Sequence, residues 1–232
     1  MTSYGDLSAL YLNCTLTRSP HLSNTHGLMD RTIALAEKQG VAVESVRLVD
    51  FDVAPGVQPD MRVQGWAADA WPDELWPKVR DADILVIGTP IWLGEVSSVC
   101  RRLIERLYAM TDETNAAGQP VFYGKVAGAI ATGNEDGVKN VNRHLLYALQ
   151  HIGYTIPPAA ETGWIGEIGP GPSYLDDDSG GPQSDYTNRT ATAMTWNLLH
   201  LARLLKDAGG IPAVGNVAAR WEAGERWGFD AG

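Results

Sequence analysis

Residues 9–25 read ALYLNCTLTRSPHLSNT, and this stretch decides the fold. Its first four residues form a short apolar run that is typical of a central strand, while Ser19-Pro20 and Ser23-Asn24 supply turn and N-cap residues that predict a helix beginning near Thr25. The N-terminus of a helix offers free backbone N–H groups and a partial positive charge to an anion. Polar side chains cluster at this point beside the charged Arg18: Thr15, Thr17, Ser19, Ser23, Asn24 and Thr25. The segment therefore predicts a phosphate site, although the same residue types also make ordinary turns and caps.

The composition indicates one globular domain. A chain of 232 residues with 44% hydrophobic and 20% charged residues can bury one substantial core. Its net charge of −10 argues against a surface for nucleic acid or for an anionic membrane. The two cysteines, Cys14 and Cys100, form no CxxC motif or Cys/His cluster, and no apolar run is long enough to span a bilayer. We therefore expect a cytoplasmic protein with no metal site and no membrane span.

Short apolar runs alternate with longer helical patterns, which is typical of a doubly wound α/β sheet. The run Ile84-Leu85-Val86-Ile87 is apolar at every position, as expected of a central parallel strand that is covered on both faces. Strands are predicted over residues 7–13, 43–48, 83–88, 125–131 and 154–160. Helices are predicted between them, over residues 24–39, 72–81, 97–110 and 138–152. The pattern predicts a three-layer α/β fold with a parallel sheet in the middle layer.

The last third of the chain departs from this rhythm. Residues 163–184 are rich in Gly, Pro, Ser and Asp and predict a long loop, in which Asp176 to Asp178 form a solvated turn rather than a metal site. Residues 185–206 predict a helix with a broad apolar face, capped by Ser184. We expect residues 1–208 to form one domain, and the tail 209–232, with its two tryptophans, to pack on that domain or on a neighbouring subunit.

Two further loops follow predicted strands. Residues 88–97 read GTPIWLGEVS and residues 131–137 read ATGNEDG. The carboxyl ends of parallel strands meet at one edge of the sheet, and ligands collect there. Each loop has a simple structural explanation as a turn, but together they place an apolar wall with Trp92 and a Gly-rich backbone with Asn134 beside the phosphate site. Flavin mononucleotide (FMN) requires this combination.

With these motifs the chain resembles the flavodoxin-like family of NAD(P)H-dependent FMN reductases and quinone reductases over about residues 7–162. The resemblance implies a five-stranded parallel sheet in the order 2-1-3-4-5, with a C-terminal helix and tail added. It also implies non-covalent FMN, NAD(P)H as co-substrate, and a homodimer or homotetramer. The FMN contacts that it implies are Thr15, Thr17, Ser23, Asn24 and Thr25 at the phosphate with Arg18 beside them, Pro90, Ile91, Trp92, Leu93 and Gly94 along the ring, and Thr132, Gly133, Asn134 and Gly137 in the third loop.

The function implied is that of an oxidoreductase that passes a hydride from NAD(P)H through flavin N5 to a quinone-like or flavin acceptor. This chemistry needs no acid or nucleophile from the protein, so no catalytic side chain is predicted. Trp164 and Tyr174 are predicted on the substrate side, with Tyr174 as a lid. The alternative is a flavodoxin-type electron carrier that does not oxidise NAD(P)H itself, but the C-terminal extension favours an enzyme with a subunit interface. A phospho-acceptor receiver shares the fold, but Asn13-Cys14-Thr15 lacks the acidic residues that it requires.

Overall fold

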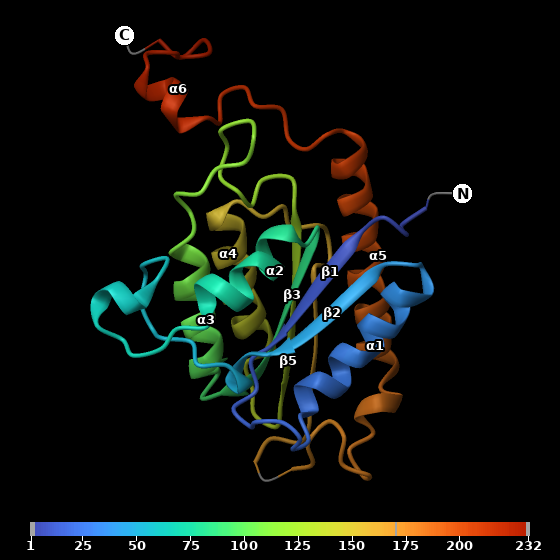
Figure 1. The fold of residues 1–232 in the computed structure, drawn as a ribbon. Coiled ribbons are helices and arrows are strands. Elements are labelled where there is room, and N and C mark those ends of the chain that lie inside the picture. Colours follow the sequence, from blue (N-terminus) through green and yellow to red (C-terminus); the bar gives the residue numbers. More distant parts are fainter. Residues whose placement is uncertain (1–2, 170, 231–232) are drawn as a thin grey trace.

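The computed structural model describes residues 3–169 and 171–230, and a parallel sheet forms its centre (Figure 1). The five parallel strands are β1 (Ser8–Asn13), β2 (Ala42–Arg47), β3 (Ile84–Trp92), β5 (Val126–Gly133) and β6 (Glu161–Ile165). They lie in the order β2-β1-β3-β5-β6, and the short β4 (Glu95–Val96) pairs antiparallel with the end of β3. Counted among the parallel strands alone, this is the order 2-1-3-4-5. The predicted flavodoxin-like fold is therefore confirmed.

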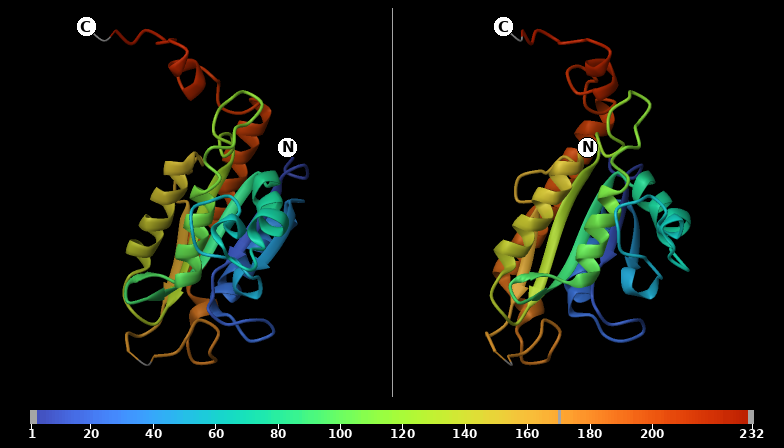
Figure 2. Two further views of the ribbon diagram at one scale, coloured as in Figure 1. Left: turned by 60° about the vertical axis from the view of Figure 1, so that its left-hand side comes forward. Right: turned by 90° about the vertical axis from the view of Figure 1, so that its left-hand side faces the viewer.

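Helices cover both faces of the sheet and give three layers (Figure 2). One face carries α1 (Asn24–Lys38) and α5 (Asp185–Asp207), and the other carries α2 (Trp76–Asp81), α3 (Ser98–Tyr108) and α4 (Val138–Ile152). Successive strand residues point to opposite faces, so Leu85 and Ile87 join the core under α3 and α4, whereas Val86 joins the core under α1 and α5. Shorter helical segments lie in the connections, at Leu48–Asp50, Met61–Gln64, Trp71–Leu75, Gly181–Gln183 and α6 (Ala218–Glu222).

The predicted strand over residues 154–160 is wrong, because the last strand of the sheet is β6 at Glu161–Ile165. Within the predicted range only Thr155 forms an isolated bridge, to Val126 of β5. Pro157 and Pro158 follow, and proline has no N–H to donate to a sheet. The strand therefore begins after them, and residues 163–165, predicted in the long loop, form its end. Of the remaining predicted loop, Pro170 lies outside the described residues.

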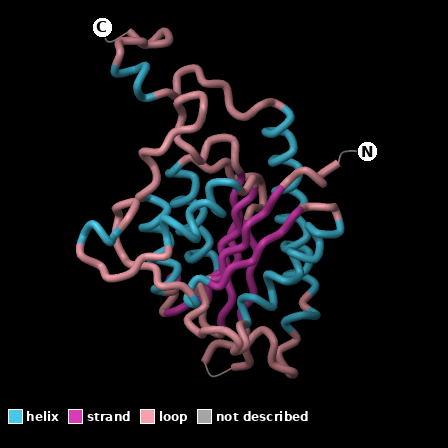
Figure 3. Tube along the Cα trace, in the orientation of Figure 1, coloured by secondary structure: helices cyan, strands magenta, loops and turns pink. Residues whose placement is uncertain are grey.

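β3 also extends beyond its predicted end at residue 88. It continues to Trp92, turns at Leu93 and Gly94, and returns as β4. Pro90 lies beside Thr132 of β5 in parallel register, so the pairing of β3 with β5 ends at these two residues. This extension carries the predicted ring wall past the edge of the sheet, where loops gather below the strands in Figure 3.

A buried ion pair holds the long connection between β2 and α2. Arg106 of α3 and Asp69 have fully buried side chains, and Arg106 Nη2 lies 2.8 Å from Asp69 Oδ2. Arg106 also donates hydrogen bonds to the carbonyl oxygens of Gln58 (2.7 Å) and Pro59 (2.9 Å). Burial of an unpaired charge is costly, so the pair and its carbonyl partners act together to fix this connection on α3.

Candidate cofactor site

The loop that follows β1, the end of β3, and the end of β5 with the residue after it converge on one cavity of about 240 Å³ at the carboxyl edge of the sheet. Part of the loop after β6 closes the same cavity. Its lining includes twelve of the residues predicted from sequence: Thr15, Thr17, Ser23, Asn24, Thr25, Pro90, Ile91, Trp92, Thr132, Gly133, Asn134 and Tyr174. Leu16, Leu22 and Ser173 complete the lining and were not predicted. The convergence expected from the strand order is thus present in the structure.

Asn13, the last residue of β1, organises the loop on the phosphate side of the cavity. Its side chain is fully buried, its Nδ2 donates to Ser23 Oγ (3.1 Å), and its Oδ1 accepts from the N–H of Thr15 (3.0 Å). Sequence reasoning did not assign Asn13 to the site. The signal that could have identified it is an amide side chain at the end of a fully buried strand, where it must find hydrogen-bond partners.

Ser23 has one hydroxyl proton left for a ligand. Its Oγ accepts from the N–H of His26 (3.1 Å), which caps α1, and from Asn13 Nδ2. A hydroxyl has two acceptor lone pairs and one donor, so both acceptor positions are used and the O–H can donate into the cavity. The first backbone N–H groups of α1 have no partner within the helix and lie at the same place. Together they form a donor set that suits a phosphate.

Thr25 and Thr132 join α1 to β5 across the floor of the cavity. Their hydroxyl oxygens lie 2.7 Å apart and share a hydrogen bond, and both residues are buried. One hydroxyl of the pair donates to the other, so a proton remains on only one of them for a ligand. The pair therefore serves as a structural link between the two loops as well as a part of the lining.

Two asparagines of the site hold the loop that follows β6. Asn134 Nδ2 donates to the carbonyl of Gly171 (3.0 Å), and Asn24 Oδ1 accepts from the N–H of Leu175 (2.8 Å). We call these two contacts the asparagine clasps. The loop they hold includes Tyr174, which is 1% exposed and packs edge to face on Trp164 with ring centroids 5.6 Å apart. The structure thus places Tyr174 as a buried anchor of this loop, and burial raises the pKa of its hydroxyl.

The β3–β4 hairpin contributes a further wall of the cavity. Ile91 is buried, whereas Trp92 is 53% exposed, and both residues line the cavity. Leu93 turns the chain with φ +53°, and its N–H donates to Glu135 Oε1 (3.0 Å). Glu135 follows β5, so a residue of the third loop holds the hairpin that carries Trp92.

Five predicted residues do not line the cavity: Arg18, Leu93, Gly94, Gly137 and Trp164. Gly94 and Gly137 instead touch each other, since a Cβ on Gly137 would lie 2.8 Å from Gly94 Cα. Arg18 is exposed on the first loop. The same loop is fixed to the residues after β2, because Ser19 donates to the Asp50 carboxylate from its hydroxyl (2.6 Å) and its N–H (2.9 Å). These hydrogen bonds lower the pKa of Asp50.

A family model described as NADPH-dependent FMN reductase matches residues 9–164. Because this match covers more than half of the chain, the chain belongs to this family, and its sheet order is the one that the flavodoxin-like fold has. The cofactor that the family implies is FMN, with NAD(P)H as its reductant. The donors at Ser23 and at the start of α1 fit its phosphate, and the exposed indole of Trp92 fits an aromatic ring.

Two curated relatives resemble most of the chain. The 8-demethyl-8-aminoriboflavin-5'-phosphate synthase of Streptomyces davaonensis is 38% identical over 205 residues, which are 87% of this chain and 79% of the relative. A divalent metal cation transporter, MntH of Mycobacterium bovis, is 55% identical over 203 residues, which are 88% of this chain but only 30% of the transporter. The chain thus spans less than a third of that relative. Among its described residues, no helix combines the length and the apolar character needed to cross a membrane.

A solved structure shares the fold over nearly the whole chain. It is that of RosB with the bound intermediate 8-demethyl-8-formylriboflavin-5'-phosphate, with a TM-score of 0.83 and 36% sequence identity. The match covers 97% of this chain and 90% of that chain. The similarity therefore includes the helix α5, which lies beyond the residues that the family model matches.

Proposed function

We propose that this chain holds FMN non-covalently in the cavity and uses it to oxidise NAD(P)H and to reduce a quinone-like or flavin acceptor. One observation carries the proposal. Ser23, which caps α1 and has a hydroxyl proton free to donate, lines the same cavity as the half-exposed Trp92. An anion donor next to an aromatic wall is what a ring ligand with a phosphate requires.

When bound, FMN supplies the redox chemistry, because its ring takes up a hydride at N5 and releases electrons to a second substrate. The chain binds and orients it. Hydroxyl groups and the first N–H groups of α1 donate to the phosphate, the β3–β4 hairpin supports the ring, and backbone groups at the end of β5 hold the pyrimidine edge. The proposed contacts are Thr15, Thr17, Ser23, Asn24 and Thr25 for the phosphate, Pro90, Ile91 and Trp92 for the ring, and Thr132, Gly133 and Asn134 for the pyrimidine edge.

An apolar rim supports a planar, weakly polar acceptor. Leu16, Leu22 and Trp92 line the cavity and are 44%, 67% and 53% exposed, and Leu93 next to them is 92% exposed. Large exposed apolar side chains gathered at one place are typical of a binding surface. A quinone or a free flavin ring can cover these side chains while it accepts electrons.

A second function follows from the two flavin-related relatives. A synthase 38% identical to this chain is named for 8-demethyl-8-aminoriboflavin-5'-phosphate, and RosB holds a flavin phosphate with a formyl group at the same position 8. The cavity that we assign to FMN as a cofactor would then bind a flavin phosphate as a substrate. In that case the flavin recovered after turnover has a changed mass.

The experiment begins with purified protein loaded with FMN. Under anaerobic conditions NADPH or NADH is added, and bleaching of the flavin absorbance is followed, then its return on addition of a quinone or of free FMN. In a separate aerobic incubation, with O₂ as oxidant and an amine donor present, the flavin is extracted and its mass is measured by mass spectrometry. Bleaching followed by recovery with unchanged flavin supports the reductase. Bound flavin that neither nucleotide bleaches indicates the electron carrier, and a flavin of altered mass indicates the second function.

Ser23→Asp tests the location of the phosphate. Asp also caps helices well, so α1 keeps its cap, while the carboxylate repels the phosphate. We expect the Kd for FMN to rise by about 100-fold or more. The control is Ser98→Asp at the start of α3, an exposed position that does not line the cavity. An equal effect of both substitutions, or none at Ser23, would place the phosphate elsewhere.

A further inference from the structure

In the described part of the chain, three α-helices begin at a serine whose hydroxyl oxygen caps the helix. These serines are Ser23 at α1, Ser97 at α3 and Ser184 at α5, and each Oγ accepts from the backbone N–H three residues further along. A hydroxyl oxygen has two acceptor positions and one proton, so each serine has one acceptor position and its proton left to use. The second partner of the serine therefore decides whether it has a proton to offer to a ligand.

Two of the three serines use their proton within the protein. Ser97 Oγ donates to the carbonyl oxygen of Cys14 (2.7 Å), and Ser184 Oγ donates to Thr187 Oγ1 (3.1 Å). Thr187 Oγ1 itself donates to the carbonyl oxygen of Gly163 (3.2 Å), so it is the acceptor in its contact with Ser184. Ser97 and Ser184 therefore have no proton left for a ligand and serve only as caps.

Ser23 differs from the other two because its second partner is a donor. Asn13 Oδ1 faces the N–H of Thr15 (3.0 Å), a group that can only donate, so the other end of the amide, which faces Ser23 Oγ (3.1 Å), is the nitrogen. With His26 on its other side, both acceptor positions of Ser23 are filled, and its proton has no acceptor among the described residues. Ser23 is 5% exposed and lines the cofactor cavity, so the proton is left to the cavity.

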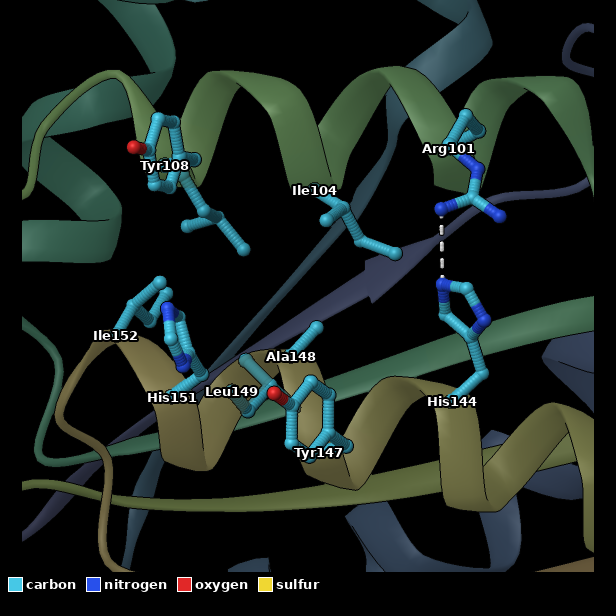
Figure 4. A pocket seen from close by; sticks show the side chains of 10 residues that line it. Arg101, Ile104, Tyr108, His144, Tyr147, Ala148, Leu149, His151 and Ile152 are labelled. Carbon is cyan, nitrogen blue, oxygen red and sulfur yellow. Dashed lines mark hydrogen bonds between the residues drawn. The ribbon is translucent and has the colours of Figure 1, made fainter.

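The direction of this proton matters because the cofactor cavity has no cationic side chain. None of the described residues that line it is Lys, Arg or His. The groove between α3 and α4 is different, since Arg101 lines it and lies 2.9 Å from His144 (Figure 4). In the cofactor cavity, neutral donors and the start of α1 must hold an anion alone. A neutral hydroxyl attracts a phosphate oxygen only when its proton, and not its oxygen, faces it.

We propose that Asn13 is a positioning residue for the phosphate, because its donation to Ser23 Oγ fixes the Ser23 hydroxyl as a donor to the bound phosphate. Asn13 is fully buried at the end of β1 and does not line the cavity, so it acts through Ser23. The inference rests on the proposed function, since it names the residue that prepares the phosphate end of the same site. A side chain that accepts from Ser23 at position 13 would turn the proton away from the cavity.

Asn13→Asp tests this role because it changes one donor atom and keeps the shape of the side chain. In the ionised form one oxygen still accepts from Thr15, while the other accepts from the Ser23 hydroxyl and draws its proton out of the cavity. In the protonated form the carboxyl donates to Ser23 as the amide does. Burial raises the pKa of the introduced carboxyl, so both forms can be reached between about pH 5 and pH 9.

The first measurement is the Kd for FMN of Asn13→Asp and of the wild type, obtained by flavin fluorescence at each pH. Carbon NMR of the introduced carboxyl reports its protonation. The ratio of the two Kd values should be within about three-fold of one while the carboxyl is protonated, and about 100-fold or more once it is ionised. The ratio cancels the titration of the phosphate and of the neighbouring groups that both proteins share, which are Cys14, His26 and Arg47, the partner of Asn13 in β2.

Asn142→Asp is the matched control. Asn142 is also a fully buried asparagine, and its Nδ2 donates to the carbonyl oxygen of Thr162 (3.1 Å), but it does not line the cofactor cavity. This variant buries a carboxyl in the same way and loses stability for the same reason. Its Kd for FMN should stay within about two-fold of the wild-type value at every pH at which circular dichroism shows it to be folded.

A double-mutant cycle tests the same role without a new charge and also serves if Asn13→Asp does not fold. Asn13→Ala frees an acceptor position on Ser23, so the hydroxyl can rotate, and Ser23→Gly removes the hydroxyl while glycine still caps α1 adequately. Each substitution should raise the Kd for FMN by about five-fold or more. The double variant should bind FMN about five-fold better than the product of the two effects predicts, because Asn13 acts through Ser23.

A Kd ratio that follows the protonation of the introduced carboxyl, together with coupling in the cycle, supports the role of Asn13. A ratio that stays constant while the carboxyl titrates, or effects that multiply without coupling, overturns it. In either of these cases a wild type that binds FMN and is bleached by NADPH leaves the proposed function in place. A wild type that binds no FMN overturns the proposed function, and this inference with it.

Discussion

Asn134 Nδ2 donates a 3.0 Å hydrogen bond to the carbonyl oxygen of Gly171, so the residue that follows β5 holds the loop that follows β6. Asn24, at the start of α1, holds the same loop through Leu175. Both residues also line the cofactor cavity. A change in the position of the loop is therefore transmitted to two residues that we propose as FMN contacts.

The two asparagine clasps differ in chemistry, which gives a matched pair of substitutions. Asn134→Asp removes the donor and sets a carboxylate against a carbonyl, whereas Asn24→Asp keeps the oxygen that accepts from Leu175. In protein without FMN, amide exchange in residues 171–176 should rise about five-fold or more for Asn134→Asp, since a hydrogen bond is worth about 1 kcal/mol. It should stay at the wild-type rate for Asn24→Asp. Equal exchange in the two variants would show that the clasps do not order the loop.

The Thr25–Thr132 hydrogen bond predicts non-additive stability. Thr25→Val or Thr132→Val alone leaves a buried hydroxyl without its 2.7 Å partner, and each should lower the free energy of unfolding by about 1–3 kcal/mol. The double substitution removes both hydroxyls and should cost clearly less than the sum of the two. Urea unfolding of the four proteins measures this coupling, and additive effects would contradict it.

The contact between Ser19 and Asp50 predicts a dependence on acid pH. Hydrogen bonds from the Ser19 side chain and then its backbone lower the pKa of Asp50 below its unfolded value of about 3.9. Because the pKa is lower in the folded state, the contact stabilises the folded protein fully at a pH above the unfolded pKa. This stabilisation is lost as the pH falls through the folded pKa. Carboxyl titration by NMR should show the pKa of Asp50 rising in Ser19→Ala. An unchanged pKa would mean that the hydroxyl does not hold the carboxylate in solution.

Gly137→Ala should distort the wall of the cavity. Gly137 has φ +131°, and the added Cβ would meet Gly94 Cα at 2.8 Å, so the hairpin that bears Trp92 must shift. The control Gly65→Ala also has positive φ, at +89°, but has open space around the new Cβ, so it carries backbone strain without the clash. We expect Gly65→Ala to lose about 1 kcal/mol of stability and Gly137→Ala to lose more, and only Gly137→Ala to weaken FMN binding. Equal effects on FMN binding would mean that the clash is relieved elsewhere.

The sequence predicts the sheet and three of its loops because local patterns encode them. The fully apolar run at Ile84 to Ile87 and the cap at Ser23 depend on neighbouring residues only, and both are found where predicted. The last strand was misplaced because Tyr154 to Ala160 is apolar enough for a strand, whereas the prolines within it cannot pair. A hydrophobic pattern does not show that a proline lacks the N–H that a sheet hydrogen bond requires.

Contacts between distant segments were the part that the sequence could not show. The pairing of Arg106 with Asp69 joins α3 to the connection after β2, and the asparagine clasps join residues more than a hundred positions apart or in different loops. Neither has a spacing that reveals it. The same holds for Trp164, which is predicted on the substrate side, whereas in the structure it packs on Tyr174 and does not line the cavity.

The contact of Gly94 with Gly137 limits how this scaffold can be altered. With no side chain between them, the hairpin after β3 and the loop after β5 act as one interlocked piece. A designer who replaces the aromatic wall with that of another flavoprotein must transplant residues 90–97 and 133–140 together. If only one segment is replaced, its backbone will not fit the native backbone of the other segment. The two loops must therefore be exchanged together to change the acceptor preference.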